Sequence, residues 1–355
     1  MKIIHTADIH LDSKMESNLP AKASSKRKSE LLLSFLEMID YAVNNNVTAV
    51  IIAGDLFDTS RISSNTAEAV LGKIKEASGV EFLYLAGNHD NGKNLLSHDV
   101  PKNLKFFSNE WTSFSYGNVV ISGAELTGDN YMSIYRGLLL DSDKFNIVTM
   151  HGGISTSFGE DLINIKELAN KGIDYLALGH YHSYSEGEID KRGKWCYSGC
   201  LEGRGFDECG DKGFIVLNID ENGFDKEFIK TSHRDILTVT VDISGLDNAA
   251  EILKKVEQSV ENINETAMVK VVLAGNIPFN ARKDLGLIKE VLDRKFFFSK
   301  VADKTRIAIN PDDFKNDISL KGEFIRLCLE SNMAEKERDR VIECGIAALS
   351  SMEVL

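Results

Sequence analysis

Residues 80–90 read V-E-F-L-Y-L-A-G-N-H-D, an apolar run that ends in a short polar turn. The apolar part, 80–86, predicts a buried β-strand bounded by a glycine. Directly after that glycine come the amide of Asn88, the imidazole of His89 and the carboxylate of Asp90. Each of these residue types is common in turns, but packing does not require all three at the mouth of a buried strand. We therefore interpret the turn as functional.

Four other polar stretches also follow strand-like apolar segments. They are Asp8-Ile9-His10, Gly54-Asp55-Leu56-Phe57-Asp58, His151-Gly152-Gly153 and Gly179-His180-Tyr181-His182. In the first part of the chain, predicted strands alternate with predicted helices at 29–44 and 65–77, which favours a parallel sheet covered by helices. Because open α/β sheets bind ligands at the carboxyl ends of their strands, we expect the polar stretches to meet there.

In this order, the five stretches resemble the signature of the calcineurin-like metallophosphoesterases: D-x-H, G-D-x-x-D, G-N-H-D, H and G-H-x-H. The match covers about the first two hundred residues. Residues 4–12 and 195–199, and the stretch Gly203–Glu208 that follows, are similar to SbcD-like DNA repair exonuclease subunits. The resemblance implies an α/β fold, a two-sheet sandwich flanked by helices, with a small C-terminal α/β cap domain. The strand-rich pattern after Leu104 agrees with a second sheet.

The resemblance also implies a centre of two divalent metal ions. A carboxylate can bridge two metals, whereas a neutral imidazole normally binds one, and by family role the bridge is Asp55. The remaining ligands would be Asp8, His10 and His182 for one ion, and Asn88, His151 and His180 for the other. Imidazole and oxygen ligands without thiolate suit manganese, iron or zinc better than magnesium or calcium. The resemblance favours manganese, and iron, zinc and magnesium are the alternatives.

Four residues are expected to assist. By family role, His89 would approach the leaving-group oxygen as a proton donor or as a cation. Asp90 would orient that imidazole and raise its pKa, because a nearby carboxylate favours the charged form. Asp58 is the expected hydrogen-bond partner of a ligand histidine. Arg204 is a candidate contact for a substrate phosphate, with an ordinary surface arginine as the alternative.

The charge distribution limits how the chain could bind nucleic acid. The formal net charge is −13, with −10 in residues 1–235 and −3 in residues 236–355. An acidic catalytic part argues against strong non-specific binding by the chain alone, because such binding rests on clustered cations. Two divalent metals would return about four positive charges to the site. The basic cluster at Lys22, Lys26, Arg27 and Lys28 is interpreted as a solvated helix start, with phosphate contact as the alternative.

A domain boundary is predicted near residues 231–235. We expect a catalytic domain at 1–235 and an α/β capping or partner-binding domain at 236–355. The second domain carries no ligand cluster, and no phosphate-cradling Gly-Lys-Ser/Thr loop occurs in the sequence. The five cysteines, with no secretory signal and no membrane-length apolar run, predict a cytoplasmic protein without a membrane span.

The expected function is a metal-dependent phosphodiesterase, acting as a DNA exonuclease or endonuclease subunit in DNA repair or end processing. The resemblance implies a homodimer and an SMC-like coiled-coil ATPase partner. The C-terminal helices are candidate docking surface, although core packing is the preferred interpretation of their apolar residues. Two alternatives remain open: a phosphodiesterase or phosphatase for small molecules such as cyclic nucleotides, and a mainly structural subunit of an ATPase–DNA complex.

Overall fold

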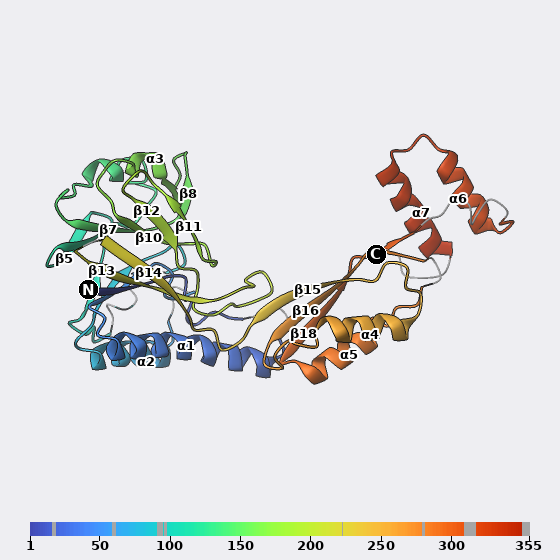
Figure 1. Ribbon diagram of the computed structural model, residues 1–355, viewed down its shortest axis with the longest axis horizontal. Coiled ribbons are helices and arrows are strands. Elements are labelled where there is room, and N and C mark those ends of the chain that lie inside the picture. The colour runs from blue at the N-terminus through green and yellow to red at the C-terminus, as the bar shows by residue number, and fades with distance from the viewer. Residues whose placement is uncertain are drawn as a thin grey trace. The chain divides into compact units, whose positions relative to one another are not determined.

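The computed structural model describes residues 1–15, 19–58, 62–90, 95, 98–221, 223–278, 281–308 and 317–349. The chain forms two compact units, Met1–Ile236 (unit 1) and Leu237–Leu355 (unit 2). Each unit has its own β-sheet structure (Figure 1). Each also has its own hydrophobic core.

Unit 1 contains two six-stranded mixed sheets, which confirms the predicted α/β fold with two sheets and flanking helices. In the first sheet the strand order is β14-β13-β1-β2-β3-β4, and β1 to β4 are parallel. In the second it is β11-β12-β10-β7-β6-β5, with β12, β10, β7 and β6 parallel. The first sheet comprises β1 Lys2–Thr6, β2 Ala49–Ala53, β3 Glu81–Leu85, β4 Leu104–Phe106, β13 Gly213–Asp220 and β14 Gly223–Lys230. The second comprises β5 Thr112–Tyr116, β6 Val119–Gly123, β7 Phe145–His151, β10 Tyr175–Gly179, β11 Ser185–Glu188 and β12 Lys194–Tyr197.

The first sheet is buried on both faces, as the continuous apolar run of β2 shows. Alternate residues of a strand point to opposite faces. Val50 and Ile52 belong to the core beneath the helices, and Ala49 and Ile51 belong to the core between the two sheets. The long apolar strands of the parallel core therefore have no solvent-facing side.

Two helices, α1 (Ala21–Asn44) and α2 (Ser64–Glu76), cover the outer face of the first sheet (Figure 1). The hydroxyl of Ser63 accepts a hydrogen bond from the Thr66 amide and caps α2. Helix α1 follows Pro20 and begins eight residues before the predicted start at 29. The additional residues include the basic cluster of Lys22, Lys26, Arg27 and Lys28, which is therefore helical. The three lysines of that cluster are exposed, but Arg27 is buried, so the interpretation as a solvated helix start was wrong for Arg27.

Shorter elements complete unit 1 on the outer side of the second sheet. These are η2 Ile134–Gly137, β8 Gly153–Ser155, β9 Leu162–Asn164 and α3 Ile165–Leu168. Their apolar side chains pack with those of β7 and β10 in a separate core cluster.

Unit 2 is a small α/β unit with a sheet of order β15-β16-β18 and a core of its own. Two C-terminal helices, α6 and α7, share a further apolar cluster that includes Ile325, Ile342 and Ile346. On α6, Leu327 remains 59% exposed. The elements are β15 Ile236–Asp242, α4 Ala249–Ser259, β16 Met268–Ala274, β17 Asn276–Ile277, α5 Leu285–Lys295, β18 Phe298–Asp303, β19 Arg306–Ile307, α6 Leu320–Glu330 and α7 Glu335–Leu349. Among the residues described, no helix combines the length and the apolar character needed to cross a membrane.

Candidate metal centre

The polar stretches come together at the carboxyl ends of strands from both sheets. Asp8 and Asp55 follow β1 and β2 of the first sheet, and His151 and His180 lie at the ends of β7 and β10 of the second. The His180 amide donates to both carboxylate oxygens of Asp8, at 2.9 and 3.0 Å. This contact joins the two sheets at the site, so residues far apart in sequence reach one cluster.

The backbone at the site is strained in the way that functional sites often are. Four predicted ligands have positive φ angles: Asp8 at 51°, His10 at 52°, Asp55 at 52° and His180 at 116°. Non-glycine residues seldom adopt this region, and each one costs of order 1–3 kcal/mol. A Cβ on Gly87 would lie 2.1 Å from Asp55 Oδ1, so only glycine lets the 87–90 turn approach this carboxylate.

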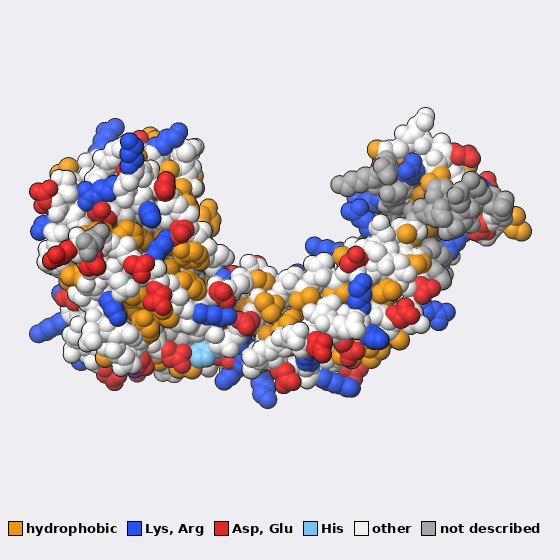
Figure 2. Space-filling view, viewed as in Figure 1, with side chains coloured by type: hydrophobic (Ala, Val, Ile, Leu, Met, Phe, Trp, Pro, Cys, Tyr) orange, Lys and Arg blue, Asp and Glu red, His pale blue; other side chains and the backbone are white. Residues whose placement is uncertain are grey.

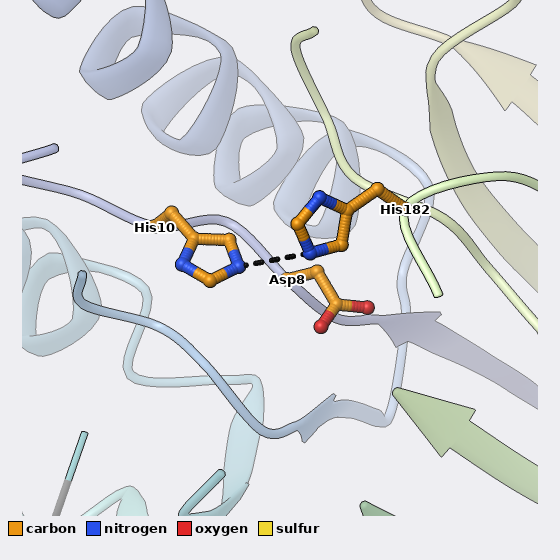
Figure 3. Close-up of side chains that lie close together, drawn as sticks. All are labelled: Asp8, His10 and His182. Carbon is orange, nitrogen blue, oxygen red and sulfur yellow. Dashed lines mark hydrogen bonds between the residues drawn. The ribbon is translucent and has the colours of Figure 1, made fainter. Parts of the chain in front are cut away.

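Asp8, His10 and His182 form one group of potential metal ligands (Figure 3). The Nε2 atoms of the two imidazoles point toward each other and lie 3.2 Å apart. Each Nδ1 faces a carboxylate: His10 faces Asp58 Oδ1 at 2.9 Å, and His182 faces Glu208 Oε1 at 2.7 Å.

These contacts determine which ring nitrogen is available to bind a cation. A carboxylate can only accept a hydrogen bond, so both Nδ1 atoms carry the protons. Arg204 Nη2 also lies 3.2 Å from His182 Nδ1, but the Glu208 carboxylate is closer to that nitrogen, at 2.7 Å, and Nδ1 cannot accept from Arg204 while it donates to Glu208. Both Nε2 atoms of the neutral rings then present lone pairs across a 3.2 Å gap. Facing lone pairs repel unless a proton or a metal cation lies between them. With the Asp8 carboxylate beside them (Figure 3), this pair of rings fits a divalent metal ion.

Asp8, Asp55 and His151 form a second potential group. His151 Nδ1 donates to the Ala53 carbonyl at 2.9 Å, which leaves Nε2 facing the Asn88 amide oxygen at 3.0 Å and Asp55 Oδ2 at 3.4 Å. Asp55 Oδ2 also lies 3.7 Å from His10 Nε2. Asp55 therefore stands between the two groups, where a bridging carboxylate would be.

The His180 ring also lies beside this second group. It packs edge-on against His151 with the ring centroids 5.5 Å apart. All seven predicted ligands are thus close to one another or to the Asp55 carboxylate.

The carboxylates at the site differ in their electrostatic environment. Burial acts to raise the pKa of Asp55, but hydrogen bonding and charge from His151, with His10 nearby, lower it to about 2. Burial likewise opposes ionisation of Asp58 and Glu208, yet their histidine and Arg204 partners lower both pKa values. Burial raises the pKa of Asp8. Three carboxylates thus remain anionic at neutral pH, which suits a cation.

His89 lies at the exposed rim of this cluster, with half of its side chain accessible. Its Nδ1 is 3.8 Å from Asp58 Oδ1, and its ring centroid is 5.1 Å from that of His10. His10, Asp58 and His89 also form a third potential ligand group. An accessible imidazole next to the ligand cluster could donate a proton to a bound substrate.

Asp90 is buried below the turn. Its oxygens accept hydrogen bonds from the backbone amides of Phe57 and Gly87 and from the Tyr84 hydroxyl. These contacts fix the turn that carries His89, and the carboxylate beside the His89 ring is that of Asp58. The expectation that Asp90 orients His89 directly stays a prediction.

Sequence reasoning did not single out Glu208, which holds His182. The available signal was its place at the end of the Gly203–Glu208 stretch. Arg204, a candidate phosphate contact with a surface arginine as the alternative, pairs with Glu208 Oε1 through Nη2 at 2.9 Å and with Asp58 Oδ1 through Nη1 at 3.0 Å. The structure therefore places Arg204 between two carboxylates that each hold a predicted ligand.

Comparison with known proteins agrees with this geometry. Residues 1–184, more than half of the chain, match the family described as calcineurin-like phosphoesterase. The chain belongs to this family. Calcineurin-like phosphoesterases are hydrolases with a dinuclear metal centre, and the resemblance identified in the sequence is thereby confirmed. The metal identity does not follow from membership of the family.

The similarity to two curated relatives covers more of the chain than residues 1–184, which match the family. The chain is 29% identical to the uncharacterized metallophosphoesterase YhaO of Bacillus subtilis, over 78% of this chain and 72% of the relative. It is 24% identical to the DNA double-strand break repair protein Mre11 of Sulfolobus acidocaldarius, over 81% of this chain and 78% of the relative. Among solved structures, a dimetal phosphatase from Danio rerio is 12% identical, covers 65% of this chain and 99% of that chain, and has a TM-score of 0.43.

Proposed function

We propose that this protein is a dinuclear-metal phosphodiesterase that cleaves DNA, as a nuclease subunit in DNA repair or end processing. The observation that best supports DNA as the substrate is the extent of the similarity to Mre11. Unit 1 holds 236 of the 355 residues, so an alignment over 81% of the chain also includes part of unit 2. Similarity confined to the metal-binding core would fit any member of the family, because a shared site gives the reaction class and not the substrate.

The ligand assignment proposed for the two ions is supported by two of the groups described above, which have Asp8 in common. One ion would be held by the group around His10 and the other by the group around His151. Asp55 would be the bridge, because its Oδ2 lies 3.7 Å from His10 Nε2 and 3.4 Å from His151 Nε2. The complete set is Asp8, His10 and His182 for the first ion, Asn88, His151 and His180 for the second, and Asp55 as the bridge. Manganese is the proposed metal, because the ligands are imidazole and oxygen without thiolate.

When bound, two divalent ions would lower the pKa of a water molecule and neutralise charge on the phosphodiester. The protein's own contribution would be to hold the ligands and to supply a proton. His89 is the proposed donor to the leaving-group oxygen, since it is accessible and lies beside the cluster. Asp58, whose Oδ1 lies 3.8 Å from His89 Nδ1, would keep His89 oriented.

The proposed division of labour is a catalytic domain at residues 1–235 and a capping or partner-binding domain at 236–355. Figure 2 shows Lys and Arg side chains interspersed with Asp and Glu over the face drawn. Since the catalytic part carries a net charge of −10, DNA binding would need the metal ions and a partner surface.

The proposed partners are a second copy of this chain, in a homodimer, and an SMC-like coiled-coil ATPase. Exposed apolar residues of α6 such as Leu320 and Leu327 are candidate contacts.

The test is hydrolysis in the presence of Mn²⁺ on end-labelled linear DNA and on bis-(p-nitrophenyl) phosphate. The variants are Asp55→Ala, which removes the bridge, and His89→Ala, which removes the proton donor. His98→Ala, in a histidine that belongs to none of the five motifs, is the matched control. We expect His89→Ala to cleave DNA about 10²- to 10⁴-fold more slowly than the wild-type protein. We expect Asp55→Ala to be inactive.

The two substrates separate the reaction class from its target. Shortening of the DNA by the wild-type protein and by His98→Ala, lost in the other two variants, would support the nuclease. Turnover of the small diester with DNA left intact, even after a coiled-coil ATPase is supplied, would move the assignment to a small-molecule phosphodiesterase.

A further inference from the structure

The segment that follows β12 surrounds His182 on several sides. Glu208 accepts a hydrogen bond from His182 Nδ1 at 2.7 Å. The backbone carbonyl of His182 accepts from the buried ammonium of Lys212 at 2.7 Å and from the thiol of Cys200 at 3.5 Å. Three side chains of one segment thus hold both the ring and the backbone of one predicted ligand.

Arg204 joins this segment to the opposite ligand of the same group. Its Nε and Nη2 atoms donate to Glu208 Oε1 at 3.1 and 2.9 Å, and its Nη1 donates to Asp58 Oδ1 at 3.0 Å. Asp58 in turn holds His10 Nδ1 at 2.9 Å. A continuous chain of contacts therefore runs from His10 through Asp58, Arg204 and Glu208 to His182.

All three guanidinium nitrogens of Arg204 are used in this chain, and only 22% of its side chain is accessible. An arginine that recognises a phosphate needs its planar fork free to face that phosphate. Here the fork faces two carboxylates of the protein, and Nη2 also lies 3.2 Å from His182 Nδ1.

We propose that Glu208 and Arg204 are positioning residues of the metal centre, which set the tautomer and spacing of His10 and His182. Each carboxylate keeps a proton on Nδ1, so both Nε2 atoms are free to bind the metal. Arg204 holds the two carboxylates together across the group and compensates one of their two negative charges. This inference rests on the proposed metal centre but not on DNA as the substrate.

The physical reason for the arginine is that a carboxylate pair needs a cation to hold it in place. Without Arg204, Asp58 and Glu208 would lose the group that links them, and each could turn away with its histidine. Partners of this kind, which orient a ligand without touching the metal, typically change metal affinity by about 10- to 100-fold when they are removed. A lysine at 204 offers one ammonium in place of a planar fork, so it cannot reproduce contacts to both carboxylates.

The experiment measures Mn²⁺ binding to the full chain by electron paramagnetic resonance of the free ion. The variants are Glu208→Gln, Arg204→Met and Arg204→Lys, each checked for folding by circular dichroism. The matched control is Arg192→Met, because Arg192 also pairs with a carboxylate of unit 1, Asp174, at 2.8 Å. We expect about 10- to 100-fold weaker binding for Glu208→Gln and Arg204→Met, a smaller loss for Arg204→Lys, and no change for Arg192→Met.

A double variant and a kinetic readout test how the residues act. Because both residues would act on the same pair of histidines, Glu208→Gln with Arg204→Met should weaken binding by less than the product of the single effects. With bis-(p-nitrophenyl) phosphate at saturating Mn²⁺, KM should match that of the wild-type protein in all variants.

The outcomes separate this inference from the proposed function. Wild-type affinity for Mn²⁺ in Arg204→Met together with a raised KM would overturn it and make Arg204 a substrate contact. Wild-type affinity in Glu208→Gln would also overturn it. A wild-type protein that binds no Mn²⁺ would overturn both this inference and the proposed metal centre.

Discussion

Replacing His5 with glutamine should make the protein less sensitive to acid. His5 lies on β1, inaccessible to solvent, with Nδ1 2.9 Å from the Tyr175 hydroxyl and Nε2 3.1 Å from the Leu178 carbonyl. It thereby ties the first sheet to the second. Burial lowers its pKa from 6.5 to about 3, and the hydrogen bond to Leu178 opposes this shift only in part.

The sign and size of the effect follow from these two pKa values. Between pH 6.5 and pH 3 the unfolded chain binds a proton at His5 that the folded protein does not, so the free energy of unfolding falls as the pH is lowered. The contribution of the neutral His5 ring to the free energy of unfolding is fully present above pH 6.5. From pH 7 to pH 5, proton binding to the unfolded chain lowers the free energy of unfolding by about 2 kcal/mol.

The assay is urea unfolding of the metal-free protein at pH 7 and pH 5, followed by tryptophan fluorescence. Both tryptophans, Trp111 and Trp195, are in unit 1, so the signal reports the unit that contains His5. His5→Gln should show a pH-dependent loss about 2 kcal/mol smaller than the wild-type loss. His5→Leu should give the same difference, since all other titrating groups are shared. Equal losses in wild-type and both variants would refute the reasoning.

Three further predictions concern the buried charges and the metal centre. Arg27→Met removes the cation that pairs with the buried Glu202 carboxylate and should lower the free energy of unfolding by about 3–5 kcal/mol. Lys75→Met, in an exposed pair, should cost less than about 1 kcal/mol by urea titration. Gly87→Ala would place a Cβ 2.1 Å from Asp55 Oδ1 and should weaken Mn²⁺ binding at least tenfold by titration, while Gly79→Ala, with open space around it, should not. Mn²⁺ at a hundred times its Kd should stabilise the wild-type protein by about 2.7 kcal/mol in thermal unfolding, and chelation or Asp55→Asn should abolish that gain.

The fold and the ligand cluster could be predicted from the sequence because local signals agree with the global arrangement. Apolar runs such as 47–53 indicate buried strands, and the polar residues that follow them must meet at one edge of a parallel sheet. Strand ends in sequence thus become neighbours in space. The same logic explains why Asp8 and Asp55 lie together although they are 47 positions apart in the sequence.

The contacts around the cluster were harder to predict, because they depend on which loop side chains turn inward. Arg27 sits among lysines, and a basic helix start normally faces water. Its helical spacing to Glu30, Leu31 and Ser34 was the signal that it lies on the buried stripe. Glu208 and Arg204 occupy an irregular segment with no periodicity, so no pattern shows that they meet His182.

The most direct test of the dinuclear centre is a crystal of the protein soaked in Mn²⁺, with diffraction recorded at the manganese absorption edge. We expect two anomalous peaks on either side of Asp55, one beside His10 and His182 and one beside His151 and His180. A single peak, or a peak held by His10, Asp58 and His89 instead, would contradict this expectation.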